Sequence, residues 1–419
     1  LHPGLAGELG YDSNFFAGAG VDPANAVAEP IVPALALRVT PSLAIQTLGT
    51  DRKPTDGAAA SPPKVDFRSK LAARLTQLYS LDSDYQEAVS LRTLIGADLD
   101  SRVAILPGRP WGADIGLNFS RVEQPNNNPS ETATASDRNV VGGSFGVRFQ
   151  PGGGALEWSL GYQAQMTIFD DTAFGLNRVV HGPRTQGRWK FLPKTALLYD
   201  GGVAFVRHTQ PNSRQTDANP VSSQLGINGL ISPRLSVLVM GGWKAMFYEV
   251  DRAGNIDDFD GPIGRAEVTW YLGNSTEQLA APEVGASTVT LGYQRDVVPS
   301  NVGNFFAMDR IFADLAYTVG GALTLGLSSS VTLLDHSVPR AADGTPLTPD
   351  GEGLLEVRPS ARLNAEYRLT NTLALVGSAE FSASPSNRYL AIRADNRVIG
   401  NDNLKYFRFT SFLGARWFM

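Results

Sequence analysis

The last segment of the chain, residues 403–419, alternates between apolar and polar side chains. The odd positions are mostly apolar: Phe407, Phe409, Leu413, Ala415, Trp417 and Met419. The even positions include Arg408, Thr410, Gly414 and Arg416. A period of two predicts a β-strand with one apolar face and one polar face. Such a strand would promote aggregation at a sheet edge in water, whereas a closed membrane barrel gives it neighbours and lipid to face.

The same alternation recurs along the whole chain. Clear examples are residues 111–120, 156–168, 265–272 and 362–369, where Trp and Tyr share the apolar face with aliphatic side chains. These segments are longer than the roughly 5 to 6 residues of a typical globular strand and suit tilted membrane strands. The pattern predicts an all-β protein, a transmembrane antiparallel up-and-down β-barrel. A large soluble all-β protein, such as a β-helix or a propeller, is the alternative.

The composition excludes several other classes. No window approaches the roughly 20 consecutive apolar residues of a transmembrane helix, and only 18 % of the 419 residues are charged. Cysteine is absent, which excludes disulfides, thiolate catalysis and Cys-based metal sites. The net charge of -5 argues against a nucleic-acid partner. We predict no metal and no cofactor.

Short and long connections alternate between the expected strands. The short ones carry turn residues and fall at 40–42, 151–154, 192–194, 232–234, 320–321 and 370–372. The long ones are polar and fall at 123–137, 210–219, 250–260 and 336–353. This asymmetry is typical of outer-membrane barrels, which have short periplasmic turns and longer outer loops.

The number of strands is ambiguous from the sequence. Alternation marks nineteen ranges: 5–16, 31–40, 42–50, 65–79, 86–105, 111–123, 138–150, 155–169, 178–191, 195–209, 220–231, 234–249, 260–273, 286–297, 305–319, 322–335, 353–369, 372–383 and 402–419. Single-chain bacterial barrels have an even number of strands. We therefore expect 18, with 16 as the alternative, and place the error in the first hundred residues, where 31–40 and 42–50 are short. Pro359 predicts a bulge or an early end in its strand.

The early start of the alternation leaves no room for an N-terminal plug. The expected organisation is a single outer-membrane barrel domain over residues 1–419 without a plug domain, which argues against a TonB-dependent transporter. No signal peptide is visible, so an exported chain would carry a leader before Leu1.

Both ends of the chain carry a family resemblance. Residues 403–419 resemble the closing strand of bacterial outer-membrane β-barrels, although Phe418 is penultimate here and Met419 is last. The stretch 7–16, with Tyr11-Asp12-Ser13-Asn14, resembles the first strand of β-barrel porins associated with exopolysaccharide export. The resemblance implies a bacterial outer-membrane location and an export conduit or an envelope-machine subunit. Asp12 and Asn14 could equally close a turn at the barrel rim.

The polar faces of the strands are rich in arginine. We predict that a basic group lines the lumen and sets selectivity: Arg68, Lys70, Arg74, Arg92, Arg148, Arg184, Arg188, Arg265, Arg358, Arg362, Arg368, Arg408 and Arg416. Fewer acids share this face, among them Asp66, Asp98, Asp114, Glu157, Glu267, Asp314, Glu356, Glu366 and Glu380. Excess cation in a water-filled path favours anionic solutes. The alternative is that arginines and acids pair into ladders that fill the lumen, and both readings can hold together.

All six tryptophans fall on the apolar phase. Trp111, Trp158, Trp189, Trp243, Trp270 and Trp417 are therefore expected to face lipid as an aromatic belt.

Other candidate chemistry is sparse. Asp257, Asp258 and Asp260 could bind a divalent cation, but they lack the spacing of a calcium-binding hand, and a solvated acidic loop is the better explanation. Asp335 and His336 are adjacent on a strand and so point to opposite faces, which prevents them from forming a catalytic dyad. We therefore predict no enzyme activity.

Two function hypotheses remain. The first is a porin-like channel for anionic solutes, or an export conduit for an acidic polysaccharide. The second is a non-conducting structural subunit of an envelope-spanning complex, such as secretion or gliding machinery. The expected partners are outer-membrane lipid and lipopolysaccharide, with periplasmic or outer-membrane proteins in the second case.

Overall fold

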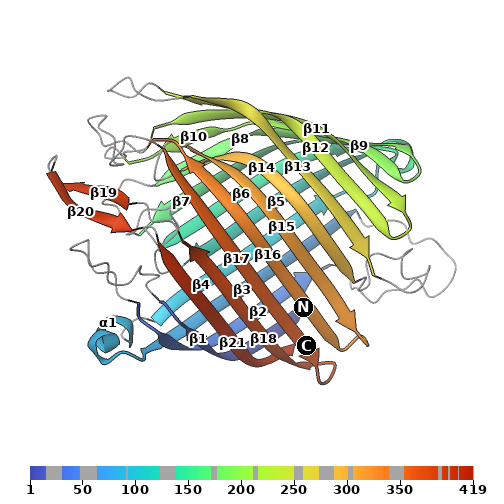
Figure 1. Ribbon diagram of the computed structural model, residues 1–419. Coiled ribbons are helices and arrows are strands. Elements are labelled where there is room, and N and C mark those ends of the chain that lie inside the picture. The colour runs from blue at the N-terminus through green and yellow to red at the C-terminus, as the bar shows by residue number, and fades with distance from the viewer. Residues whose placement is uncertain are drawn as a thin grey trace.

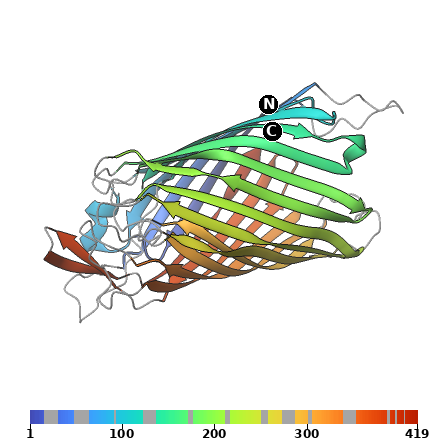
Figure 2. The same cartoon turned by 90° about the horizontal axis from the view of Figure 1, so that it is seen from above.

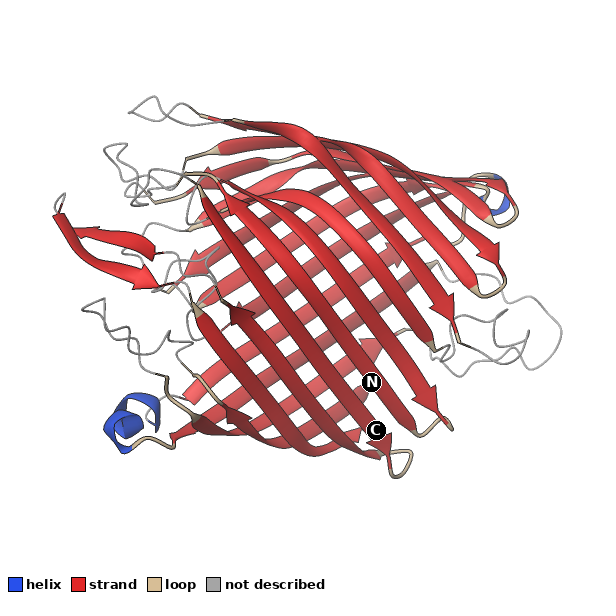
Figure 3. Ribbon diagram, viewed as in Figure 1, coloured by secondary structure: helices blue, strands red, loops and turns tan. Residues whose placement is uncertain are grey.

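The computed structural model is a closed antiparallel β-barrel of eighteen strands (Figures 1 and 3). The structure describes residues 1–15, 31–47, 64–90, 93–122, 137–170, 177–210, 216–249, 258–272, 287–300, 305–338, 353–385, 389–394, 397–403 and 405–418. None of the helices in these ranges is long and apolar enough to cross a membrane.

The barrel strands follow one another in chain order, each pairing with the next. Their bounds are β1 His2–Asp12, β2 Ala34–Gln46, β3 Val65–Ser80, β4 Thr93–Ile105, β5 Trp111–Val122, β6 Arg138–Phe149, β7 Leu156–Phe169, β8 Arg178–Leu192, β9 Thr195–Val203, β10 Phe205–His208, β11 Ala218–Ser232, β12 Leu235–Tyr248, β13 Phe259–Tyr271, β14 Thr288–Pro299, β15 Phe305–Val319, β16 Leu323–His336, β17 Leu354–Arg368, β18 Leu373–Ser384 and β21 Tyr406–Phe418. β9 and β10 are two parts of one barrel strand, interrupted at Ala204, because both pair with β8 and β11.

Five short elements lie outside the barrel wall. The 3-10 helix η1 (Ser83–Tyr85) and helix α1 (Gln86–Ser90) join β3 to β4, and the 3-10 helix η2 (Gly152–Gly154) lies in the turn before β7. Strands β19 (Tyr389–Ala394) and β20 (Arg397–Asn403) form a separate hairpin between β18 and β21. Figure 2 shows α1 and this hairpin at the end of the barrel opposite to both termini.

The closing strand pairs as the alternation predicted. β21 lies between β18 and β1, with Trp417 opposite Leu373 on one side and Leu5 on the other. No described edge of the barrel remains open, which satisfies the requirement that backbone groups in hydrocarbon be paired.

The expected number of eighteen strands is confirmed, and the surplus nineteenth range lies where we placed the error, at Pro41. The described parts of ranges 31–40 and 42–50 contribute to one strand, β2 (Ala34–Gln46), and Thr40-Pro41-Ser42 is not a turn. Pairing of β2 with β1 continues through Pro41, whereas the ladder to β3 skips Thr40 and Pro41. Proline has no N–H to donate, so it removes ladder contacts on one side without ending the strand.

Three other predicted boundaries need correction. Pro359 causes neither a bulge nor an early end, because β17 pairs with β16 in one register past it, while pairing with β18 begins at Ser360. The range 86–105 begins with α1, so that its strand starts at Thr93. The first strand ends at Asp12 and not at residue 16.

The other predicted short turns lie at the end of the barrel that carries the termini, and the strand ends that flank the predicted long links lie at the other end (Figure 1). Gly320 and Gly321, which join β15 to β16, have φ of 57° and 70°, a conformation that favours glycine. The ends of β2 and β3 that flank residues 47–64, and the ends of β13 and β14 that flank residues 272–287, also lie at the terminus end; alternation did not mark these two links as long. By the rule for outer-membrane barrels, the end with the short turns is periplasmic.

The outer wall is apolar and exposed. Leu413 is 72 % exposed and Ile311 is 66 % exposed, and most large exposed hydrophobic side chains lie on this outward phase. A closed barrel with such a wall fits a bilayer and not water. The chain therefore has the closed strand pairing and the outer surface of a membrane-spanning β-barrel.

Candidate functional site: the lumen wall beside the seam

The lumen holds a cavity of about 1480 Å³ beside the seam between the first and last strands. We call it the seam cavity, and its wall is formed mainly by β16, β17, β18, β21, β1, β2, β3, β4 and β5, which follow one another around the barrel. Eight arginine and lysine side chains and six carboxylates line it: Arg38, Lys70, Arg74, Arg121, Arg362, Arg368, Arg408 and Arg416, with Glu8, Asp12, Asp98, Asp100, Glu366 and Glu380. The excess of cations makes the cavity electropositive.

Strand register shows which side chains face the lumen in the rest of the barrel, starting from the residues that line this cavity. Residues directly opposite each other in a ladder share a face of the sheet. Through successive pairs such as Gly112 with Arg148, and Glu157 with Arg188, the inward phase is fixed for β6 to β15. The predicted group Arg68, Lys70, Arg74, Arg148, Arg184, Arg188, Arg265, Arg358, Arg362, Arg368, Arg408 and Arg416 lies on this inward phase. Arg92 lies outside the described residues.

Most of these arginines are paired with carboxylates. Arg362 donates from Nη2 to Glu380 Oε2 at 2.8 Å, across adjacent strands. Glu366 accepts from two arginines, with Arg416 Nη1 at 2.8 Å and Arg368 Nε at 3.6 Å. Arginines and carboxylates therefore form ion pairs on this wall, as the alternative of ion-pair ladders predicted.

The same ladder continues away from the cavity. The additional pairs are Arg68 with Asp66, Arg184 with Asp200, Arg265 with Glu267, Arg358 with Glu356, and Arg102 and Arg148 with Asp114. Lys70 and Arg188 have no carboxylate within 4.0 Å among the described residues, although Asp100 and Glu157 lie directly opposite them in the ladders.

The paired arginines remain open to the lumen. The side chains of Arg362 and Arg368 are each 58 % exposed, and those of Arg74 and Arg416 are each 51 % exposed. A guanidinium with one carboxylate partner retains N–H groups that can donate to a passing anion. Pairing and anion attraction are thus compatible on this wall.

Arg38 differs from the rest of the group, and alternation did not single it out. Its guanidinium lies over the ring of Phe412, 3.5 Å from the centroid, and Nη1 is 3.6 Å from Glu8. Its Nε is buried without a hydrogen-bond partner. Phe412 is an aromatic side chain on the inward phase, and Gly10 opposite it leaves the space that its ring fills.

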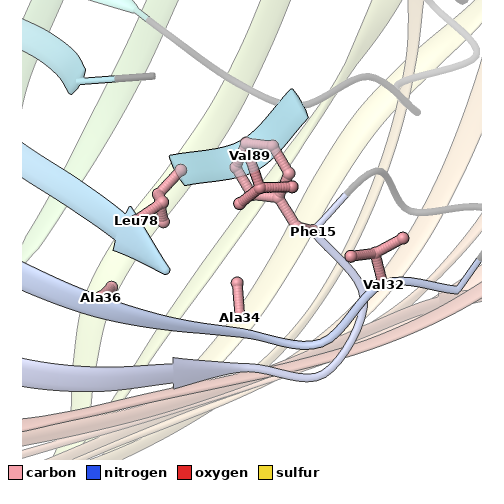
Figure 4. Close-up of a cluster of buried hydrophobic side chains, with 6 residues drawn as sticks. All are labelled: Phe15, Val32, Ala34, Ala36, Leu78 and Val89. Atoms are coloured by element: carbon pink, nitrogen blue, oxygen red, sulfur yellow. The ribbon is translucent and has the colours of Figure 1, made fainter. Parts of the chain in front are cut away.

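Helix α1 narrows the outer mouth above this cavity. Val89 is fully buried against Phe15, Val32, Ala34, Ala36 and Leu78, as Figure 4 shows. Ala34, Ala36 and Leu78 all lie on the inward phase of β2 and β3. Val89 therefore attaches α1 to the inner wall at the outer end, a constriction that the sequence did not indicate because 86–105 was assigned to a strand.

The Tyr11-Asp12-Ser13-Asn14 stretch builds the seam at the outer rim. Arg408 donates from Nη2 to Asp12 Oδ2 at 2.5 Å, and the N–H of Asn14 donates to Asp12 Oδ1 at 3.1 Å. Asn14 Nδ2 donates to the carbonyl of Phe407 at 3.1 Å. The turn reading of these residues is correct, and their side chains hold the first strand to the last.

A buried polar cluster lies on the inward phase at the outer end. His336 Nε2 is 3.5 Å from Glu356 Oε2, and Ser300 Oγ is 3.5 Å from His336 Nδ1. The order Ser300, His336 and Glu356 resembles the nucleophile, base and acid of a catalytic triad. However, Glu356 accepts from Arg358 Nε at 2.6 Å, and the side chains of all three residues are buried. We assign them to structure. Asp335 lies on the opposite phase, as adjacent residues in a strand must.

The acidic loop is only partly described. Asp257 lies outside the described residues, Asp258 accepts from the N–H of Tyr248, and Asp260 accepts from Trp243 Nε1. No group of three potential metal ligands occurs in the described part of the chain.

All six tryptophans lie on the outward phase and are 41 to 60 % exposed. Five of them, all except Trp243, lie near the short-turn ends of their strands. Cross-strand contacts join this band, with the rings of Trp111 and Phe149 4.5 Å apart. Trp243 alone lies nearer the outer end.

Comparison with known proteins adds little. No known family model matches the sequence. No curated protein matches it significantly. Among solved structures, the chain is similar to OccK5 (OpdH) of Pseudomonas aeruginosa, at 10 % identity and a TM-score of 0.48, over 100 % of this chain and 98 % of that one. OccAB4 of Acinetobacter baumannii gives 10 % identity and 0.44, over 100 % and 98 % of the two chains. The FrpB iron transporter of Neisseria meningitidis gives 8 % and 0.47, over 100 % and 82 %. With scores below 0.5, the strand pairing and not the likeness defines the fold.

Proposed function

We propose that the protein is an outer-membrane channel that conducts small anionic solutes. The observation that supports this most is the seam cavity, in which eight cationic side chains face six carboxylates. In a narrow path between low-dielectric walls, such an excess raises the local concentration of anions and lowers that of cations.

Exposure of the arginines supports a role at the solute path. A fully structural ladder would bury its guanidinium groups, whereas Arg362, Arg368 and Arg416 are more than half exposed. Exposed ion pairs contribute only about 0 to 1 kcal/mol to stability. The protein therefore loses little stability when one of these arginines exchanges its contact with a carboxylate for a contact with a solute.

The conduit for an acidic polysaccharide has less support. It rests on Tyr11-Asp12-Ser13-Asn14, and these residues are occupied in the seam. The non-conducting subunit is favoured only by the constriction at α1, which narrows the mouth without occupying the seam cavity. In either case we expect the outward aromatic band to contact membrane lipid and lipopolysaccharide.

Charge variants of the lumen test this proposal. Replacing Arg362 and Arg368 by Gln leaves Glu366 and Glu380 in place, so the lumen loses two positive charges. In planar bilayers with a KCl gradient, the reversal potential should move toward cation preference. The matched control is the charge-retaining change of the same arginines to Lys, which should leave the sign unchanged. An unchanged reversal potential in the Gln variant would contradict a role for these side chains at the path.

A further inference from the structure

Among the described residues, a set of cations without a carboxylate partner lies at the short-turn end of the barrel, and a set of carboxylates without a cation partner lies at the outer end. At the short-turn end, a set of described cations has no carboxylate within 4.0 Å: Lys64, Arg109, Lys190, Lys194 and Arg234. All five are exposed. Lys70 and Arg188 are left out of this set because a carboxylate lies directly opposite each of them. We call these five residues the rim cations.

The rim cations are held in place by the backbone. Leu106 donates its N–H to the carbonyl of Lys64 at 2.7 Å, and Leu230 donates to that of Lys194 at 2.9 Å. Tyr271 donates to the carbonyl of Arg234 at 2.9 Å, and the N–H of Lys190 donates to Ala155. The N–H of Arg109 donates to the carbonyl of Leu106 at 3.2 Å, so the backbone of each rim cation is bonded to a neighbouring strand or turn at the entrance.

Proline reinforces three of these positions. Pro110 follows Arg109, while Pro193 and Pro233 precede Lys194 and Arg234 in their tight turns. A fixed φ restricts the backbone of a turn. A proline next to a cation therefore restricts the backbone in three turns of the periplasmic rim.

At the outer end, four described carboxylates have no cation partner. Asp82, Asp84 and Glu87 lie in the segment that narrows the mouth, and Asp258 directly precedes β13. No cation lies within 4.0 Å of these four carboxylates in the part of the chain that the structure describes. The described residues therefore make the periplasmic entrance electropositive and the outer entrance electronegative.

We propose that the rim cations recruit anions at the periplasmic entrance and make the pore pass anions more readily from the periplasmic side to the outer side, an inference that rests on the proposed anion channel. Anions gather at the positive mouth and cations at the negative mouth. A voltage that is negative on the periplasmic side drives both kinds of ion into the pore, which fills with carriers. The opposite voltage draws both kinds out, and the pore is depleted.

Current–voltage curves of single channels in bilayers test this. The chain has no cysteine, so an Asn371→Cys variant carries one thiol in the turn between β17 and β18. Biotin on that thiol binds streptavidin only from the chamber facing this turn, which gives the orientation of each channel. At 0.1 M KCl, where the Debye length is about 10 Å, the current should be roughly 1.5-fold larger with the periplasmic chamber negative. At 1 M KCl, where the Debye length is about 3 Å, the two directions should converge.

Substitutions at the rim separate this inference from the proposed function. The double variant Lys194→Gln/Arg234→Gln should lose most of the asymmetry and keep its anion preference, because both residues lie outside the seam cavity. The charge-retaining double variant Lys194→Arg/Arg234→Lys should keep the asymmetry. The double variant Asp84→Asn/Glu87→Gln removes negative charge from the outer entrance and should also reduce the asymmetry of the current.

The outcomes have distinct meanings. A symmetric curve in an anion-selective channel, or asymmetry that survives the Gln double variant, would overturn the role of the rim cations alone. A channel that prefers cations, or no channel at all, would overturn the proposed function and this inference with it.

Discussion

Arg408, on the last strand of the barrel, holds Asp12, on the first, through contacts from Nε to both carboxylate oxygens at 3.1 Å and from Nη2 to Oδ2 at 2.5 Å. The two residues are 396 positions apart in the chain. The side chain of Asp12 is 7 % exposed, whereas the lumen pair Arg74 and Asp98 is about half exposed. The seam is thus closed by a shielded ion pair in addition to its backbone ladder.

Breaking this pair should destabilise the barrel more than breaking an exposed one. Arg408→Gln leaves the shielded carboxylate of Asp12 without its charge partner, which costs about 3 kcal/mol. The matched variant Arg74→Gln should cost at most about 1 kcal/mol. Heat-modifiable mobility on a denaturing gel, measured against temperature, compares the two. Equal unfolding temperatures of the two variants would show that the pair of Arg408 and Asp12 stabilises the barrel no more than an exposed lumen pair does.

The backbone seam itself should be indispensable. Residues 413–418 pair with Gly4 to Leu9 on β1, and 413–417 pair with Leu373 to Gly377 on β18. Deleting Leu413 to Met419 would leave both neighbours with unpaired backbone groups in hydrocarbon, each costing several kcal/mol, so insertion should fail. Trp417→Ala removes one outward indole and no backbone bond, and this variant should still fold with weaker anchoring. A truncated chain that runs as a compact barrel would contradict the closing role.

The constriction at the outer mouth should depend on Val89. Val89→Asp would bury a charge among Phe15, Ala34 and Leu78, which detaches α1 from the inner wall. Single-channel conductance should then rise. Gln86→Asp adds the same charge at an exposed position of α1 and should leave the conductance near the wild-type level. A conductance unchanged in both variants would mean that α1 does not narrow the path.

The tryptophans should report the two leaflets separately. Trp243 is the one nearer the outer end, whereas the other five lie near the short turns. A quencher confined to the outer leaflet should therefore reduce the fluorescence of the wild type slightly and have almost no effect on Trp243→Phe. Strong quenching that persists in the variant would place other indoles at the outer interface.

Alternation in the sequence predicted the barrel well because lipid imposes it. Each wall residue faces either hydrocarbon or the lumen, so even the aromatic closing strand follows a period of two. The pattern failed at Pro41, because a missing ladder donor on one side looks in sequence like a turn. It also failed at α1, where Val89 was taken as part of a strand and instead packs onto the inner wall.

The ion pairs could not be predicted from the sequence. Alternation gives the face of Arg362 and Arg416, but their partners depend on strand register and on which strands become neighbours. Arg416 contacts Glu366, 50 positions earlier, because β18 brings β21 and β17 close together. Phe412 was also missed as a lumen residue, although its even position among inward arginines was a visible signal.

The central claim is that the lumen conducts anions. The wild-type protein in a planar bilayer under a tenfold KCl gradient tests it directly. We expect stable open levels and a reversal potential whose sign shows preference for chloride over potassium. The absence of an open level at any salt concentration, or a reversal potential with the sign of potassium preference, would contradict the claim.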